Sequence, residues 1–473
     1  MAEPDATTTP PPKSGPDGQA GGAYVYVIAF IAAAGGFNFG LDIVLMSGAI
    51  LYLERYFSLS AWEKGFTMTS ANYGALAGLI VGSRLADWLG RKRTLILAAV
   101  LLLVGTAGST FADTLPVWNA YRVLGGVGAG LAAMVSPLYI SEIAPARRRG
   151  LLVTVNQMAI VLGAFLSNVV AYVIAREYGA QPDCWRWMFA SAGPPVALFL
   201  VGLFFVPRSP RWLVMKNQPE EARAVLTRVG GRAHAEEELQ AITASLSEET
   251  GGFGELFQPG IRMALTIAVG LALFQQLAGV STLINYAPTV FQNAGIKSEE
   301  AAIGNTVILR VWDIGWTLFA IFYVEKLGRR PLLLVGVLGM ALGQLLMGLN
   351  FFYSLPPLFT LVVFFVCLAA YDVSLAPLAW LIMSEIFPTR VRARGMAVAA
   401  LFMQLSGMGL GQVFPPLIES FREWFGTEAG VFWIFCGFCL AAFAFSYSLV
   451  PETRGRTLEQ IAEWWSRKPK EAA

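Results

Sequence analysis

The stretch SEIAPARRRG, residues 141–150, recurs in the second part of the chain as SEIFPTRVRARG, residues 384–395. Two further pairs of segments repeat in the same way: ADWLGRKR (86–93) with VEKLGRRP (324–331), and VPRSPRWL (206–213) with VPETRGRTL (450–458). Equivalent residues of the three pairs lie 243, 238 and 244 positions apart. Because the three offsets agree this closely, we expect the chain to consist of two halves of one structural design.

The sequence between these repeats is apolar. Hydrophobic residues make up 56% of the chain, charged residues 14%, and the mean hydropathy is +0.57. A helix needs roughly 20 apolar residues to cross a bilayer. Segments of this kind lie near 24–53, 61–84, 93–112, 117–140, 150–175, 186–205, 261–290, 299–323, 330–351, 356–384, 394–418 and 427–449. They lack the alternation of β-barrel strands, so we expect an all-α membrane protein with twelve transmembrane helices, six in each pseudo-symmetric half.

The basic residues of the chain fall in alternate loops. The clusters are Arg91 to Arg93, Arg147 to Arg149, Lys326 with Arg329 and Arg330, and Arg390 with Arg392 and Arg394. Loops rich in Lys and Arg face the cytoplasm, so these loops and both termini are predicted to be cytoplasmic. The net charge of +2 gives no reason to expect a nucleic-acid partner.

These observations predict a domain organisation. We expect a disordered cytoplasmic tail over residues 1–22, six-helix halves over 23–207 and 259–450, a cytoplasmic helical linker over 208–258, and a second cytoplasmic tail over 451–473. The linker is acidic, amphipathic and too polar to span a membrane. Duplicated halves around a site at the bilayer midplane are typical of secondary transporters.

The repeated motifs place acids beside arginines where helices end at the cytoplasmic surface. Arginine and carboxylate side chains form strong two-pronged pairs, so we interpret the motifs as a latch that opens when the cytoplasmic side opens. The alternative is that they serve only as positive anchors. The expected latch residues are Asp87, Arg91, Glu142, Arg149, Glu325, Arg329, Glu385, Arg394 and Glu452.

Several classes of chemistry are not expected. His234 is the single histidine, which argues against histidine-based metal sites, histidine proton relays in the membrane, and hydrolytic triads. We therefore expect no enzyme, metal or cofactor, and any proton chemistry within the membrane must use carboxylates. Gly126 and Gly130, in GGVGAG, are interpreted as a small-residue contact between helices rather than as a nucleotide-binding loop.

Six motifs together resemble the sugar porters of the major facilitator superfamily, over residues 23–461. They are GSRLADWLGRKR (82–93), RVLGGVGAG with PLYISEIAPARRRG (122–150), FQQLAGVSTLINYAP (274–288), LGRRPLLL (327–334), APLAWLIMSEIFP (376–388) and VPETRGRTLEQI (450–461). The resemblance implies a major facilitator fold that moves a monosaccharide or polyol through a central cavity by alternating access. It implies as partners the sugar, a proton and the lipid bilayer, and we expect a monomer in the plasma membrane.

The resemblance also implies roles for single residues. Gln157, Gln275, Gln276 and Trp380 stand where family members contact sugar, Phe39 at an aromatic wall and Tyr286 at an extracellular gate. Amides bind hydroxyl groups as donors and acceptors, and an indole covers an apolar sugar face. The alternative for the glutamines is hydrogen bonding between helices.

Asp42, in the first predicted span, is the residue on which the expected mechanism depends. The resemblance pairs it with Arg122 of the fourth span and implies proton symport, because proton-coupled family members carry an acid at this position. A purely structural ion pair is the alternative. The competing functions are a uniporter without proton coupling, a non-transporting sugar sensor and a drug exporter.

This chain also departs from the family pattern. Ser281 and Asn285 stand where Asn and Tyr are common, Gln404 where Trp is common, and Arg208 where Glu is usual. The last difference predicts a weaker latch on one side. Ser281 is still expected to be one of the residues that bind the sugar.

Two charged residues interrupt the apolar run NTVILRVWDIGWTLFAIF, residues 305–322. Arg310 and Asp313 lie three residues apart, hence on one helix face. We expect Asp313 to reach the sugar cavity together with Asp372, which occupies a position near sugar in animal relatives. Arg310 would steady Asp313 or Asp372, or form a structural pair.

Overall fold

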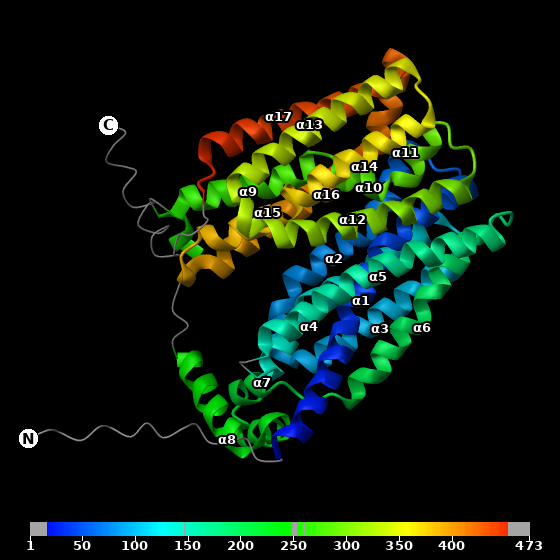
Figure 1. Cartoon of the computed structure of the whole chain (residues 1–473). Helices are drawn as coiled ribbons and strands as arrows, with labels where there is room; N and C mark the ends of the chain where they lie inside the picture. Colours follow the sequence, from blue (N-terminus) through cyan, green and yellow to red (C-terminus); the bar gives the residue numbers. More distant parts are fainter. Residues whose placement is uncertain (1–16, 146–147, 248–252, 259–260, 453–473) are drawn as a thin grey trace, which may run out of the picture.

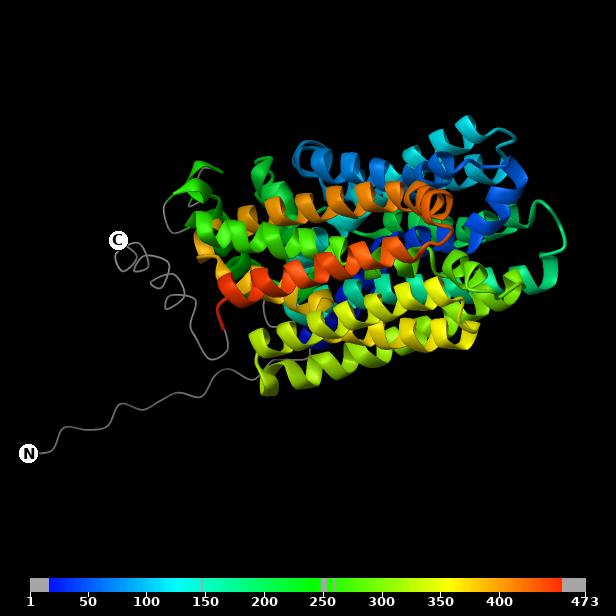
Figure 2. The same ribbon diagram turned by 90° about the horizontal axis from the view of Figure 1, so that it is seen from above.

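The structure is a computed structural model that describes residues 17–145, 148–247, 253–258 and 261–452. Within these residues it consists of helices and contains no strand. Figure 1 shows two bundles side by side, one built from α1 to α6 and the other from α9 to α17. Seen from above, the long helices of both bundles run in roughly one direction (Figure 2). The predicted fold class is confirmed.

The first bundle contains six long helices. They are α1 (Asp17–Phe57), α2 (Ala61–Leu89), α3 (Arg91–Phe111), α4 (Leu115–Ile143), α5 (Arg149–Tyr178) and α6 (Cys184–Phe205). Two linker helices follow, α7 (Pro210–Met215) and α8 (Pro219–Ser247), with a short 3-10 helix at Phe253–Phe257. The helix α1 begins at Asp17, before the start of the apolar run, within the segment that the sequence predicts to be a tail. The rest of that segment lies outside the described residues, and so do residues 453–473 of the second tail, which is predicted over 451–473.

The second bundle repeats this plan with two interrupted crossings. Its helices are α9 (Ile261–Leu277), α10 (Val280–Asn285), α11 (Ala287–Asn293), α12 (Glu299–Leu327), α13 (Arg329–Tyr353), α14 (Pro357–Val373), α15 (Leu375–Ile386), α16 (Thr389–Phe425) and α17 (Ala429–Leu449). The first break falls at Gly279, whose φ of 81° favours glycine. The second falls at Ser374, between α14 and α15.

Ten stretches are long and apolar enough to cross a membrane within the described residues. The remaining two crossings are α2 and α12, each 29 residues long. These two helices occupy equivalent positions in the two halves, and both carry charged side chains along their length, including Arg84 and Asp87 in α2 and Arg310 and Asp313 in α12. The chain is thus a multi-pass membrane protein, and α2 and α12 carry charged side chains within their crossings.

Glycine lets α2 and α4 approach closely. A Cβ atom on Gly126 would lie 2.1 Å from the backbone oxygen of Ala71, and one on Gly130 would lie 2.1 Å from that of Ala75. Neither position has room for a side chain, which agrees with the predicted small-residue contact.

The bundles have two distinct ends. We call the end where α3, α5 and α13 begin, with Arg91, Arg149 and Arg329, the basic end, and the opposite one the far end. The linker helices α7 and α8 lie at the basic end, and the two bundles diverge toward it (Figure 1).

Candidate functional site

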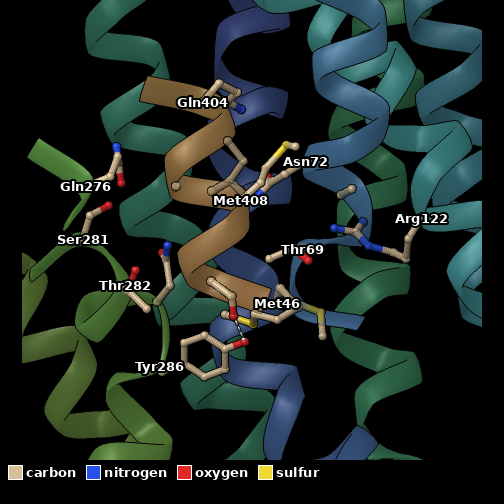
Figure 3. A pocket seen from close by; sticks show the side chains of 16 residues that line it. Met46, Thr69, Asn72, Arg122, Gln276, Ser281, Thr282, Tyr286, Gln404 and Met408 are labelled. Atoms are coloured by element: carbon tan, nitrogen blue, oxygen red, sulfur yellow. Dashed lines mark hydrogen bonds between the residues drawn. The ribbon is translucent and has the colours of Figure 1, made fainter. Parts of the chain in front are cut away.

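Both bundles contribute to a cavity near the middle of the molecule. Its polar lining consists of Thr69, Asn72 and Arg122 from the first half, and Gln276, Ser281, Thr282, Asn285, Tyr286 and Gln404 from the second. Met46, Met68 and Met408 add an apolar surface. Arg122 approaches the cavity from the side opposite Gln276 and Ser281 (Figure 3). Amides and hydroxyls on several walls suit a small ligand with many hydroxyl groups.

A buried ion pair stands in the cavity wall. One Nη atom of Arg122 lies 2.5 Å from Oδ1 of Asp42, and the other lies 3.3 Å from Oδ2. Both residues are almost fully buried, with 3% and 6% of their surface exposed. The guanidinium also lies over the ring of Phe189, 5.1 Å from its centroid. Arg122 lines the cavity while Asp42 does not, so the carboxylate is one side chain away from a bound ligand.

Tyr286 separates the central cavity from a second hollow toward the far end, because it lines both. Its hydroxyl donates a hydrogen bond of 2.8 Å to the backbone oxygen of Gly411, and its ring lies 5.1 Å from that of Phe414. The residue is 1% exposed. This position suits the predicted gate.

Side-chain bonds join the two halves between the cavity and the far end. Tyr73 of α2 bonds to Gln412 of α16, and Arg55 of α1 bonds to Glu299 of α12. The helices also touch directly, because a Cβ on Gly65 would lie 2.0 Å from the backbone oxygen of Gln412. The cavity is therefore closed toward the far end.

Six of the predicted sugar-contacting residues do not line this cavity: Phe39, Gln157, Gln275, Asp313, Asp372 and Trp380. Gln275 is buried and donates a hydrogen bond of 3.1 Å to the backbone oxygen of Ala376, so it connects α9 to α15. Phe39 packs against an apolar cluster within the first half. Gln157 and Trp380 are exposed. Gln276 and Ser281 are brought to the cavity as predicted.

The charged residues of α12 form a separate cluster. Arg310 and Asp313 are paired at 3.2 Å, and Asp372 of α14 lies close enough to interact with both. Asp372 is 2% exposed, and its Oδ2 atom has no hydrogen-bond partner among the described residues. Neither aspartate lines the central cavity. The structure therefore places Asp313 and Asp372 with each other, outside the cavity lining. Tyr371 of α14 interacts with both aspartates and with Ser281, so this cluster adjoins the cavity.

The latch residues of the first half meet at its basic end. Arg91 lies 2.8 Å from Glu142 and 3.0 Å from Asp87. Glu142 also accepts a hydrogen bond of 2.5 Å from Ser209. Arg149 instead pairs with Glu238 of α8 at 3.0 Å, so it holds the linker.

The second half repeats this arrangement in part. Arg329 lies 3.2 Å from Glu385, and Glu452 accepts hydrogen bonds from the backbone N–H groups of Arg329 and Arg330. Arg394 has a buried Nη1 atom without a partner in the part of the chain that the structure describes. The side chain of Glu325 lies outside the described part. The bonds named here and the Arg91 pairs each stay within one half.

Sequence reasoning missed several cavity residues. Thr69, Asn72 and Thr282 carry no motif signal, because any polar residue of a crossing can bond within its own helix instead. Asn285 and Gln404 stood out as departures from the family pattern, and both line the cavity. Asn285 and Gln404 could therefore have been found from the sequence, because each is a polar residue where the family commonly has a different residue.

Two six-helix halves that share one polar cavity, with a buried ion pair in its wall, define a secondary transporter of the major facilitator type. The model of the family described as sugar (and other) transporter matches residues 28–465. The chain belongs to this family, as its motifs predict.

Two relatives of known name match this chain over nearly their whole length. The D-xylose-proton symporter of Escherichia coli K12 is 35% identical over 485 residues, covering 95% of this chain and 97% of the symporter. The arabinose-proton symporter of Bacillus subtilis is 34% identical, covering 93% and 95%.

Solved structures show the same fold. The E. coli xylose transporter in an inward open conformation superimposes with a TM-score of 0.79 at 33% identity, covering 93% of this chain and 100% of that one. The same transporter bound to 6-bromo-6-deoxy-D-glucose gives 0.73 at 35% identity, covering 94% and 99%.

Proposed function

We propose that this chain imports a monosaccharide or polyol together with a proton, by alternating access. The observation that carries the proposal is the position of Arg122, which bonds to Asp42 and also lines the cavity. One side chain thus contacts both a titratable carboxylate and the place where a sugar would bind. Two relatives are named as symporters of xylose or arabinose with a proton, and these names support the proposal that a sugar and a proton are transported together.

The geometry suggests how proton and sugar are coupled. An ionised Asp42 holds Arg122 through a charge-assisted pair. Protonation removes that negative charge and frees the guanidinium, whose Nε already has no hydrogen-bond partner among the described residues, to bond to a sugar hydroxyl. Release of the proton restores the pair and withdraws Arg122 from the sugar. The paired state seen here is the one expected after proton and sugar have left.

The basic end is proposed to face the cytoplasm, with both termini on that side, because loops rich in Lys and Arg are retained there. Each proton that moves inward down the membrane potential then releases about 2.3 kcal/mol per 100 mV, which can drive accumulation of the sugar. We place the protein in the plasma membrane as a monomer, since one chain contributes both walls of the cavity.

The direct experiment is uptake of labelled pentoses, hexoses and inositols into liposomes that contain the purified chain, with and without an inward proton gradient. We expect one of these solutes to accumulate above its external concentration, and a protonophore to abolish the accumulation. Uptake that only equilibrates, with the same rate in both conditions, would contradict proton coupling and identify a uniporter.

A further inference from the structure

A third hollow, distinct from the central cavity and from the one beyond Tyr286, lies at the basic end of the first half. It is lined by Leu89, Gly90, Ile96, Ser209, Trp212 and the side chains of Arg91, Lys92, Arg93 and Arg208. Four lining residues are basic and none is acidic. Arg91 is already paired with Asp87 and Glu142. Neighbouring positive charges repel unless an anion lies between them, so the repulsion that an anion would relieve lies among the other basic side chains, above all Lys92 and Arg208.

The second half of the molecule shows which group belongs at this position. There the carboxylate of Glu452 accepts hydrogen bonds of 3.1 Å from the first backbone N–H groups of α13, those of Arg329 and Arg330. The same turn precedes both helices, because Gly90 and Gly328 share a φ of 88°. Glu452 thus supplies a fixed anion to the start of α13.

In the first half the residue equivalent to Glu452 is Arg208. The first backbone N–H groups of α3, those of Arg91 and Lys92, have no acceptor in the described ranges, and Gly90 provides no side-chain cap. A helix start of this kind attracts an anion through its free N–H groups and its dipole. The position that a carboxylate holds in the second half is held here by a cation.

The surrounding charges make this helix start more positive. Lys92 and Arg208 lie close enough for their charges to interact. Lys92 donates a hydrogen bond of 2.9 Å to the backbone oxygen of Phe204, which is neutral. The acid beside Arg208 is Glu221, at 3.4 Å and half exposed, which makes a weak pair. Among the residues that the structure describes, no strong counter-charge therefore serves these two cations.

We propose that this hollow binds a phosphate group, which takes the place that Glu452 fills in the other half. A phosphate has enough acceptor oxygens to bond to the two backbone N–H groups and to Lys92 and Arg208 together. Phe204 and Phe205, 61% and 76% exposed, lie at the end of α6 beside Lys92. The headgroup of an anionic phospholipid and free inorganic phosphate share this chemistry, and the lipid would also contact these two rings.

The test uses the purified full chain and measures its melting temperature. In one arm inorganic phosphate replaces chloride at constant ionic strength. In the other arm the chain sits in phosphatidylcholine nanodiscs with or without phosphatidic acid. We expect a saturable rise in melting temperature in at least one arm, and the arm that responds identifies the source of the phosphate.

Two variants of Arg208 and one control variant make the test specific. Arg208→Glu places a carboxylate where Glu452 stands in the second half. In the absence of phosphate this variant should have a higher melting temperature than the wild type, and added phosphate or phosphatidic acid should not raise it further. Arg208→Gln should weaken the apparent affinity about tenfold, as expected for the loss of one charge-assisted hydrogen bond. Arg176→Glu, the same charge change at the exposed far end of α5, should keep the wild-type response. No rise in either arm, or equal responses in Arg208→Glu and wild type, would overturn the proposal. The test is independent of sugar transport.

Discussion

At the level of single residues, Arg122 and Gln276 lie on opposite sides of the cavity, and the residue next to Gln276 shows that residue type alone does not identify a ligand contact. Gln276 lines the cavity, while the adjacent Gln275 is turned away and bonds to the backbone of Ala376. Residues that are adjacent on a helix point about 100° apart. Only one of two identical side chains therefore reaches the ligand.

The two glutamines should differ in what their removal changes. Gln276→Ala should raise the KM for the transported sugar about three- to tenfold, the effect of losing one hydrogen bond of about 0.5–1.5 kcal/mol, and leave the melting temperature unchanged. Gln275→Ala should lower stability by about 1 kcal/mol through the lost link between α9 and α15, with a smaller change in KM. Uptake kinetics and thermal melting on the same preparations check both. An equal rise of KM in the two variants would contradict this assignment.

At the scale of helices, the fold depends on contacts that exclude side chains. The α2–α4 contact is the clearest, because Gly126 meets the backbone of Ala71 directly. By contrast, a Cβ atom added to Gly437 of α17 would meet nothing within 4 Å. Gly126 allows a close contact between two helices and Gly437 does not, although both lie in apolar crossings.

Valine at these two positions should therefore have opposite consequences. Gly126→Val should destabilise the protein by about 1–3 kcal/mol, the usual range for overpacking, because α2 and α4 must separate. Gly437→Val adds the same atoms into open space and should leave stability within about 0.5 kcal/mol. Thermal melting in one detergent compares them. A melting temperature of Gly126→Val at the wild-type value would show that the helices are not held at this contact.

Sequence alone predicted more of the helices than of the site. The repeats and apolar runs predict both halves. The pairing of Asp42 with Arg122 is what the family resemblance implies, and it agrees with the cost of unpaired charges inside a membrane. The direction in which the second-half side chains point was not predictable from the sequence. The helix breaks at Gly279 and Ser374 change the orientation of the residues that follow them. The partner of Arg149 was not predictable either, because Glu238 comes from the linker.

At the scale of the whole molecule, the structure represents one of the states that transport requires. The halves are bonded toward the far end, through Arg55 with Glu299 and Tyr73 with Gln412. These bonds must break when the cavity opens to the far end, because they connect opposite halves. Transport therefore requires the two halves to rock about the cavity between them.

A covalent bridge at the far end should stop this motion. The double variant Arg55→Cys with Glu299→Cys, treated with a short thiol cross-linker, should lose uptake, and a reductant should restore it if the linker is cleavable. Each single variant, treated in the same way, serves as control and should retain uptake. Unchanged uptake in a double variant shown by mass spectrometry to be cross-linked would contradict the alternation between end states.

We propose that protonation of Asp42 couples the movement of sugar to that of a proton. Simultaneous recording of sugar and proton fluxes in liposomes for the wild type, Asp42→Asn and Asp113→Asn tests this coupling. Asp113 carries an exposed carboxylate at the far end, so its variant makes the same chemical change outside the site. We expect Asp113→Asn to behave as wild type, and Asp42→Asn to exchange sugar down its gradient without proton movement or accumulation. Proton-driven accumulation that persists in Asp42→Asn would contradict the account.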